Sequence, residues 1–119
     1  MDILVTNNPL VKNLYDNEFQ VDFIETDLSG VLIHVRDLIH KGHKLLTHPL
    51  SGSIKPNENI YKSVIISDTT KITDLQSVTI IEECIITAKK FPVRQISEQF
   101  MQDMQMIDLS LISSAYRNR

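Results

Sequence analysis

The residues from Asp27 to Gly42 carry the strongest structural signal in the sequence. Asp27 can accept hydrogen bonds from the first free N–H groups of a helix, and Gly42 can adopt the left-handed conformation after its end. Between them apolar residues recur at intervals of three and four, the pattern of an amphipathic helix: Leu28, Val31, Leu32, Val35, Leu38 and Ile39. The sequence therefore predicts a helix here, with one face buried against a core.

The length of the chain, 119 residues, is typical of a single domain. Hydrophobic residues make up 42% and charged residues 23%, which are the fractions of a soluble globular protein. The apolar runs are too short for a membrane span, and the opening "MDILVTNNP" lacks the basic and long apolar regions of a signal peptide. We expect one domain over residues 1–119, located in the cytoplasm and without a membrane partner.

Four short apolar segments, at residues 2–6, 20–26, 43–48 and 63–67, are predicted as strands. With the helix between them, residues 20–48 form a strand, helix, strand unit whose strands are expected to be parallel. The connection from Pro49 to Lys62 is long and holds no clear helix, so the direction of the fourth strand stays open: antiparallel at an edge, or parallel if a short helical turn forms near "NENIYK".

Three further helices complete the prediction. A short one falls within residues 10–19, and a second follows Thr73, which has the capping-box spacing to Gln76, with an inward stripe that ends before Phe91-Pro92. The last helix, 97–117, carries two apolar stripes. We expect the first, Phe100, Met104, Ile107 and Leu111, to pack on the domain, while the second, Leu109, Ile112 and Tyr116, is a candidate contact for a homo-oligomer.

The resulting fold class is α/β: a single domain with a short, mostly parallel four-stranded sheet covered by helices, and a C-terminal helical hairpin. Residues 1–91 would form the α/β core and residues 97–117 the C-terminal helix. In such sheets ligands bind beyond the carboxyl ends of the strands. The "TNNP" turn after the first strand and the loop after the third would both lie at that edge.

The distribution of charge points to a small anionic ligand. The net charge of −3 argues against nucleic acid as a partner. Residues 34–62, however, carry a local +3 and all four histidines, whereas the rest of the chain carries −6. Chance clustering on solvated faces is the alternative reading; the sharper one is a local positive potential suited to a small anion.

The loop "THPLSGSIKPN", residues 47–57, is the candidate binding segment. Its "SGS" tripeptide can form a nest of backbone N–H groups, because glycine tolerates positive φ, although such a tripeptide is also common in plain turns. The predicted ligand-binding residues lie in this loop and at the first strand's end: Asn7, Asn8, His48, Ser51, Gly52, Ser53 and Lys55. Lys55 would supply the charge, and Asn7, Asn8 and His48 would line the rim.

Other chemistries receive weaker support. No nucleotide or dinucleotide fingerprint can be drawn through the three glycines, so no cofactor is expected. His40, His43 and His48 are spaced poorly for one metal ion, and the single cysteine, Cys84, sits among apolar and acidic residues that favour a buried, unreactive thiol. An enzyme acting on an acyl or phosphoryl group remains the alternative, with His48 as general base beside Ser51 or Ser53.

Three stretches of this chain resemble the GrdX family: "TNNPLV", "VRDLIHKGHKLLTHPLSGSIKPNENIYKSVIIS" and "AKKF". The resemblance covers most of residues 1–91, is densest from Val35 to Ser67, and is weaker in the C-terminal helix. GrdX proteins are encoded beside the glycine, sarcosine and betaine reductases of amino-acid-fermenting anaerobes. These reductases use selenoprotein and thiol chemistry and release acetyl phosphate.

The resemblance implies an accessory or regulatory role, with reductase components as partners. A redox role in the main chemistry does not fit a chain whose one thiol is Cys84. Holding or sensing a small anion, such as a carboxylate or an acyl phosphate, agrees with both the resemblance and the local charge.

Overall fold

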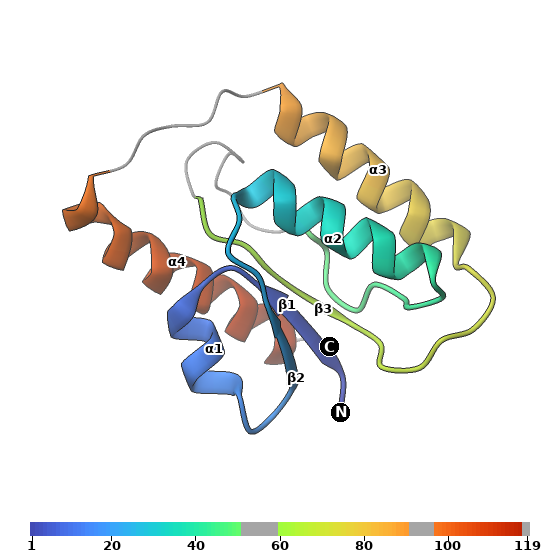
Figure 1. Ribbon diagram of the computed structural model, residues 1–119, viewed down its shortest axis with the longest axis horizontal. Coiled ribbons are helices and arrows are strands. Elements are labelled where there is room, and N and C mark those ends of the chain that lie inside the picture. Colours follow the sequence, from blue (N-terminus) through green and yellow to red (C-terminus); the bar gives the residue numbers. More distant parts are fainter. Residues whose placement is uncertain (51–59, 91–96, 118–119) are drawn as a thin grey trace.

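The computed structural model describes residues 1–50, 60–90 and 97–117 and has three layers, with helices on both faces of a small sheet (Figure 1). In chain order the elements are β1 (Ile3–Thr6), α1 (Pro9–Tyr15), β2 (Gln20–Phe23), α2 (Leu28–His40), β3 (Ser63–Ile66), α3 (Leu75–Lys89) and α4 (Glu98–Arg117). The α/β class predicted from the sequence is confirmed.

The sheet is three-stranded and mixed, in the order β2-β1-β3, so the prediction of a mostly parallel four-stranded sheet is wrong. β1 pairs with β2 in parallel across the α1 crossover, and β1 pairs with β3 antiparallel. The antiparallel direction is one of the two that the sequence left open for this strand. Because β3 is antiparallel to β1, the chain between α2 and β3 does not need the long crossover, usually helical, that a parallel strand would require.

The expected third strand, residues 43–48, is reduced to one antiparallel bridge between Leu45 and Ile66. The backbone N–H of Leu46 donates to the Ile65 carbonyl at 2.9 Å, which extends the pairing by one step. The N–H of Ile65 then donates to the side-chain Oγ1 of Thr47 at 3.0 Å instead of to a backbone carbonyl. A side-chain hydroxyl thus replaces the ladder partner and ends the pairing.

The helix caps explain where two of the helices begin. Asp27 caps α2 by accepting from the Gly30 N–H at 2.8 Å, and Gly42 follows the helix with φ 109°, both as predicted. The cap of α3 is Asp74 and not Thr73, so that prediction is wrong. The Asp74 carboxylate accepts from both the N–H and the hydroxyl of Ser77, at 3.0 and 2.6 Å, which a threonine hydroxyl cannot match.

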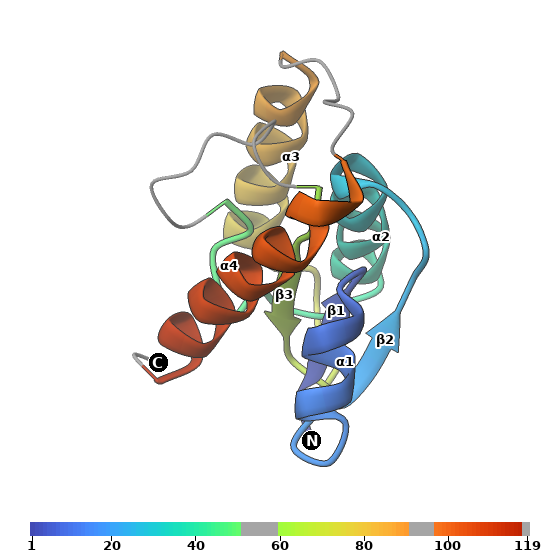
Figure 2. The same ribbon diagram turned by 90° about the vertical axis from the view of Figure 1, so that its left-hand side faces the viewer.

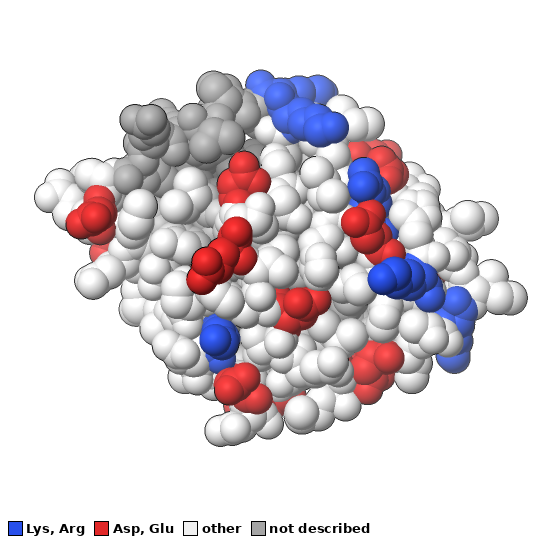
Figure 3. Space-filling model, viewed as in Figure 1, with Lys and Arg blue, Asp and Glu red and all other residues white. Residues whose placement is uncertain are grey.

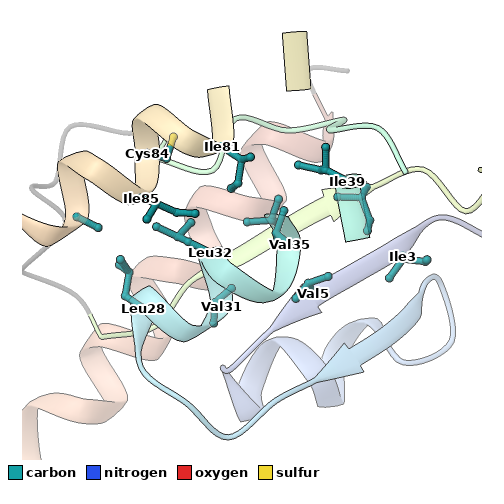
Figure 4. Close-up of a cluster of buried hydrophobic side chains, with 13 residues drawn as sticks. Ile3, Val5, Leu28, Val31, Leu32, Val35, Ile39, Ile81, Cys84 and Ile85 are labelled. Atoms are coloured by element: carbon teal, nitrogen blue, oxygen red, sulfur yellow. The ribbon is translucent and has the colours of Figure 1, made fainter. Parts of the chain in front are cut away.

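Alternating side chains of the strands build two cores. Ile3 and Val5 of β1 belong to the core shared with α2 and α3, and Leu4 belongs to the core shared with α1 and α4. Figure 2 shows these two pairs of helices on opposite sides of the strands. Figure 4 shows the first core, in which Val31, Leu32 and Val35 of α2 meet Ile81 and Ile85 of α3. Residues that are fully buried in this way contribute about 1.5–3 kcal/mol each.

The C-terminal helical hairpin is not formed, because α3 packs on α2 while α4 packs on α1 across the opposite face of the sheet. Each of the two expected stripes of α4 is only partly buried. In the stripe expected to pack on the domain, Met104 and Leu111 are half-buried, whereas Phe100 and Ile107 are exposed. In the other stripe, Ile112 is 4% exposed and packs with Leu109 in the second core, whereas Tyr116, which makes edge contacts with the rings of Tyr15 and Phe19, is 38% exposed.

Candidate functional site at the carboxyl edge of β1

A group of buried polar side chains lies where β1 ends and β3 begins. Five residues there are each at most 7% exposed: Thr6, Asn7, Asn8, Ser63 and Asp108. Buried polar groups are costly unless they are hydrogen-bonded, and these are bonded to one another and to the backbone. We call this set, together with Lys62, the carboxyl-edge cluster.

Asn7 joins three separate segments at this edge. Its Nδ2 donates to the Thr26 and Ile60 carbonyl oxygens, both at 2.8 Å, and its Oδ1 accepts from the Lys62 N–H at 2.8 Å. Both amide hydrogens are therefore committed within the protein. In this arrangement Asn7 positions the turns around the edge, and its amide donors are already occupied.

Asn8 and Ser63 converge on one carboxylate oxygen of α4. Asn8 Nδ2 and Ser63 Oγ donate to Asp108 Oδ2 at 3.0 and 2.7 Å, and Thr6 Oγ1 lies 2.7 Å from Ser63 Oγ. Burial raises the pKa of Asp108 above its ordinary value, while these two hydrogen bonds and the charge of Lys62 act in the opposite direction. The cluster therefore holds a buried acidic group whose charge is only partly compensated.

Lys62 brings a cation to the same edge. Its backbone is held on both sides by Asn7, through the N–H described above and a 3.4 Å contact from the Asn7 N–H to the Lys62 carbonyl. Burial lowers the pKa of its ammonium group, and the charge of Asp108 partly opposes that effect. Within residues 1–50, 60–90 and 97–117, no hydrogen bond or ion pair to the ammonium is found. A partly buried ammonium without a hydrogen-bonded partner in the described residues favours an anionic partner.

The predicted loop is described only as far as Leu50; Ser51, Gly52, Ser53 and Lys55 lie outside the described residues. His48 is exposed, and its Nδ1 accepts from the Leu50 N–H at 3.1 Å. A neutral imidazole with an accepting Nδ1 carries its proton on Nε2. In this conformation His48 offers a ligand a donor and not a base.

The two groups expected to converge make separate contacts. Asn7 and Asn8 bond to α4 and to the segments around Thr26 and Ile60, whereas His48 bonds to Leu50. Residues 45–47 do run in the direction of β1, since both are antiparallel to β3, so the chain reaches His48 at the carboxyl edge. In the described part of the chain no hydrogen bond links the two groups.

A surface pocket of about 430 Å³ adjoins the edge. It is lined by Asn7, Pro9, Phe23, Glu25, Thr26, Asp27, Ile60 and Tyr61. Among the described residues of its lining, the charged side chains are the carboxylates of Glu25 and Asp27, which disfavour an anion beside them. Lys62 is not one of these described lining residues.

A model of the GrdX-like protein family matches residues 3–117 of the chain. The chain belongs to the GrdX-like family. No curated protein and no solved structure matches it. The match extends through α4, so it includes the part of the chain where the resemblance noted from the sequence was weakest.

Sequence reasoning missed two members of the cluster of this GrdX-like chain. Asp108 lies between Ile107 and Leu109 on α4, and its helical spacing to Ile112 places it on the buried stripe. A carboxylate on an inward stripe was the available signal. Lys62 entered only the charge count, because no pattern in the sequence shows that Asn7 fixes its backbone.

Two other sequence expectations concern Cys84 and metal binding. Burial raises the pKa of the Cys84 thiol to about 11, so it stays protonated near neutral pH. Among the residues that the structure places, no three His, Cys, Asp or Glu side chains are arranged to hold a metal ion. No helix in those same segments has both the length and the apolarity of a membrane span.

Proposed function

We propose that this GrdX-like protein is a non-catalytic accessory or regulatory component of a glycine, sarcosine or betaine reductase system. Its role is to hold a small anion, a carboxylate, phosphate or acyl phosphate, at the carboxyl edge of β1. Family membership supports the reductase context. The observation that carries the anion site is the Lys62 ammonium, which is partly buried and has no partner in the described residues.

The proposed site combines Lys62 with the residues expected from the sequence. His48 would donate from Nε2, and Ser51, Gly52, Ser53 and Lys55 would add backbone N–H groups, hydroxyls and a second charge. Asn7 and Asn8 would act as positioning residues, since their amides already bond to Thr26, Ile60, Gln105 and Asp108. This division separates residues that contact the ligand from residues that shape its site.

Binding of acetate, inorganic phosphate and acetyl phosphate to the purified protein tests the proposal by calorimetry. Lys62→Met and Lys55→Ala should each weaken affinity about tenfold, because each removes a charge-assisted contact. Lys62→Arg keeps the charge and should bind within about threefold of the wild type. Unchanged affinity in both Lys62→Met and Lys55→Ala would show that the anion lies elsewhere or does not bind.

The enzyme alternative makes a different prediction for the same samples. If His48 acts as a base, acetyl phosphate should be consumed, and His48→Ala and Ser53→Ala should abolish turnover. The bond from the Leu50 N–H to Nδ1 favours a donor role for His48. We therefore expect acetyl phosphate to be bound and recovered intact, and sustained turnover lost in both variants would replace the accessory function with the enzyme.

The partner proposal is tested separately with purified reductase components. The accessory function predicts a complex with at least one of them in sedimentation or gel filtration. A homo-oligomer through α4 stays a prediction as well. Of the residues predicted for that contact, Tyr116 is exposed and Ile112 is buried, and Phe100 and Ile107 add exposed apolar surface on the same helix.

A further inference from the structure

The opposite edge of the sheet, where β3 ends, holds a second pocket that is independent of the proposed site. Its volume is about 290 Å³, at the small end of the range of ligand pockets. The lining residues are Gly42, Lys44, Ser67, Thr69, Lys71, Ile72 and Asp74. They come from two loops, one between α2 and the Leu45 bridge and the other between β3 and α3. We call this the β3-end pocket.

Hydrogen bonds join the two loops into a defined frame. The Lys44 N–H donates to Ser67 Oγ, and the Ser67 N–H donates to the Lys44 carbonyl, both at 2.8 Å. The Lys71 N–H donates to the Gly42 carbonyl at 3.1 Å, and His43 Nδ1 lies 2.7 Å from the Ser67 carbonyl oxygen. Both lysine backbones are thus fixed, and only their side chains are free to adjust.

Gly42 sets how closely the loops approach. A Cβ at this position would lie 2.3 Å from the Lys71 carbonyl oxygen and 2.9 Å from the Lys71 nitrogen. Its φ of 109° also disfavours any other residue. Glycine is therefore required at position 42 for two reasons: the positive φ that follows the end of α2, and the close approach of the Lys71 backbone that shapes the pocket.

The charges that face this pocket leave it positive. In the segments that the structure describes, neither ammonium of Lys44 and Lys71 takes part in a hydrogen bond or ion pair. One carboxylate, Asp74, also lines the pocket and keeps its charge while accepting two bonds from Ser77, so the described lining holds two cations and one anion; the nearby Asp68 pairs with the Met1 ammonium at 3.0 Å. The Ser77 bonds lower the pKa of Asp74 most, with a smaller contribution from the charge of Lys44.

Figure 3 agrees with this account on the face it shows. Several Lys and Arg side chains lie toward the end of the molecule where α2 finishes and α3 begins, although carboxylates are interspersed with them. In the described part of its lining, the pocket itself has two lysines, Lys44 and Lys71, and one carboxylate, Asp74, and a net positive charge of this kind attracts a small anion.

We propose that the β3-end pocket binds a phosphate or phosphoryl group between the ammonium groups of Lys44 and Lys71. The Thr69 hydroxyl lines the same pocket and can donate a further bond. Ile72, which is 94% exposed, stands at the rim and can contact an organic substituent on the phosphoryl group. The site is separate from the carboxyl edge, so it stands or falls independently of the proposed function.

Titration with inorganic phosphate, followed by amide chemical shifts at constant ionic strength, tests the inference. A saturable set of shifts should appear on residues 42–44 and 67–71, separate from any shifts that phosphate causes at the carboxyl edge. As followed on residues 42–44 and 67–71, binding should weaken about fivefold in each of Lys44→Gln and Lys71→Gln and be lost in the double variant, whereas Lys62→Met should leave it unchanged. Lys89→Gln, an exposed lysine near the far end of α3, is the matched control and should leave binding unchanged.

The comparison of probes makes the result decisive. Sulfate should compete with phosphate, whereas acetate and chloride should not reproduce the shifts. A methyl phosphate ester that binds more tightly than phosphate, with the advantage lost in Ile72→Ser, would identify an organic phosphate as the ligand; equal or weaker binding would identify the free anion. No saturation by about 10 mM phosphate, or equal shifts with chloride, would overturn the site.

Discussion

The two ends of the sheet differ in how their polar side chains are arranged. At the carboxyl edge of β1, Asn8, Ser63 and Asp108 are buried and bond to one another, and the buried Asn7 bonds to the backbone around it. At the other end, Lys44 and Lys71 stand at the mouth of an open pocket whose frame is made by backbone groups and by Ser67. At one end the polar side chains stabilise the fold through hydrogen bonds, and at the other the lysine ammonium groups can contact a ligand.

The contribution of a polar side chain to stability is therefore distinct from its ability to bind a ligand. A side chain such as Asn7, with every donor engaged, is expensive to remove but has little to offer a ligand in this conformation. A side chain such as Lys71 contributes little to folding, since exposed charges are worth about 0–1 kcal/mol, yet it is free to bind. Substitutions at the two ends should therefore affect stability and binding in opposite proportion.

The largest effect is expected at Asp108. Asp108→Leu should lower the free energy of unfolding by about 3–4 kcal/mol, because Asn8 Nδ2 and Ser63 Oγ lose a buried acceptor. Asp108→Asn can still accept both bonds and should cost about 1 kcal/mol or less. Urea unfolding measures both, and equal losses in the two variants would contradict a role for the shared oxygen.

Asn7→Ala should follow, with a loss of about 2–3 kcal/mol. The change leaves the Thr26 and Ile60 carbonyls and the Lys62 N–H without their partner. Thermal unfolding is the measurement, and exposed Asn13 offers a control that should change by less than about 0.5 kcal/mol on substitution by alanine. A tolerated Asn7→Ala would mean that water or a shift of residues 60–62 replaces the amide.

At the opposite end the corresponding change is Gly42→Ala. Positive φ and the close Lys71 carbonyl should make it cost about 1–2 kcal/mol, less than the loss at Asn7. The affinity of the β3-end pocket for phosphate should also fall in Gly42→Ala, although both lysines of the pocket are kept, whereas the control Lys89→Gln should leave it unchanged. If the affinity for phosphate is unaltered while the free energy of unfolding falls, the close approach of the two loops serves stability and not phosphate binding.

The smallest effect is a dependence on pH that belongs to Asp108. Because burial raises its pKa, the folded state takes up a proton at a higher pH than the unfolded state does. The destabilisation caused by the buried charge is complete above the folded pKa. It is relieved as the pH falls through that pKa toward the ordinary value of 3.8. The wild type should therefore gain stability relative to Asp108→Asn as the pH falls from 7 toward 4. A constant difference across that range would mean that Asp108 titrates normally.

The sequence was sufficient for elements whose signals are local. The stripe of α2 with its caps Asp27 and Gly42 predicted a complete helix, and β1, β2 and β3 lie inside the segments expected to be strands. It was insufficient where a distant residue decides. Thr47 ends the pairing of residues 43–48 through the Ile65 N–H. The two stripes of α4 are similarly apolar, so the position of α1 decides which of their residues are buried.

The candidate site shows the same limit. The sequence placed Asn7, Asn8 and His48 near one edge because turns after strands gather there. It offered no information on which of their donors are already used. Lys62 and Asp108 are separated by 46 positions, and their electrostatic interaction follows only from the packing of α4 beside β3.

The hydroxyl of Thr47 also bears on how the protein avoids association through its sheet. An open strand edge presents unpaired N–H and C=O groups to which another chain can add. Thr47 Oγ1 occupies the Ile65 N–H, and the Leu45 bridge covers Ile66, so the outer side of β3 is closed to an incoming strand. The other edge, β2, is four residues long and carries Asp22, held 2.6 Å from His34. A short strand with a charged side chain resists edge-to-edge pairing, so copies of this small sheet should not stack into fibrils from either side.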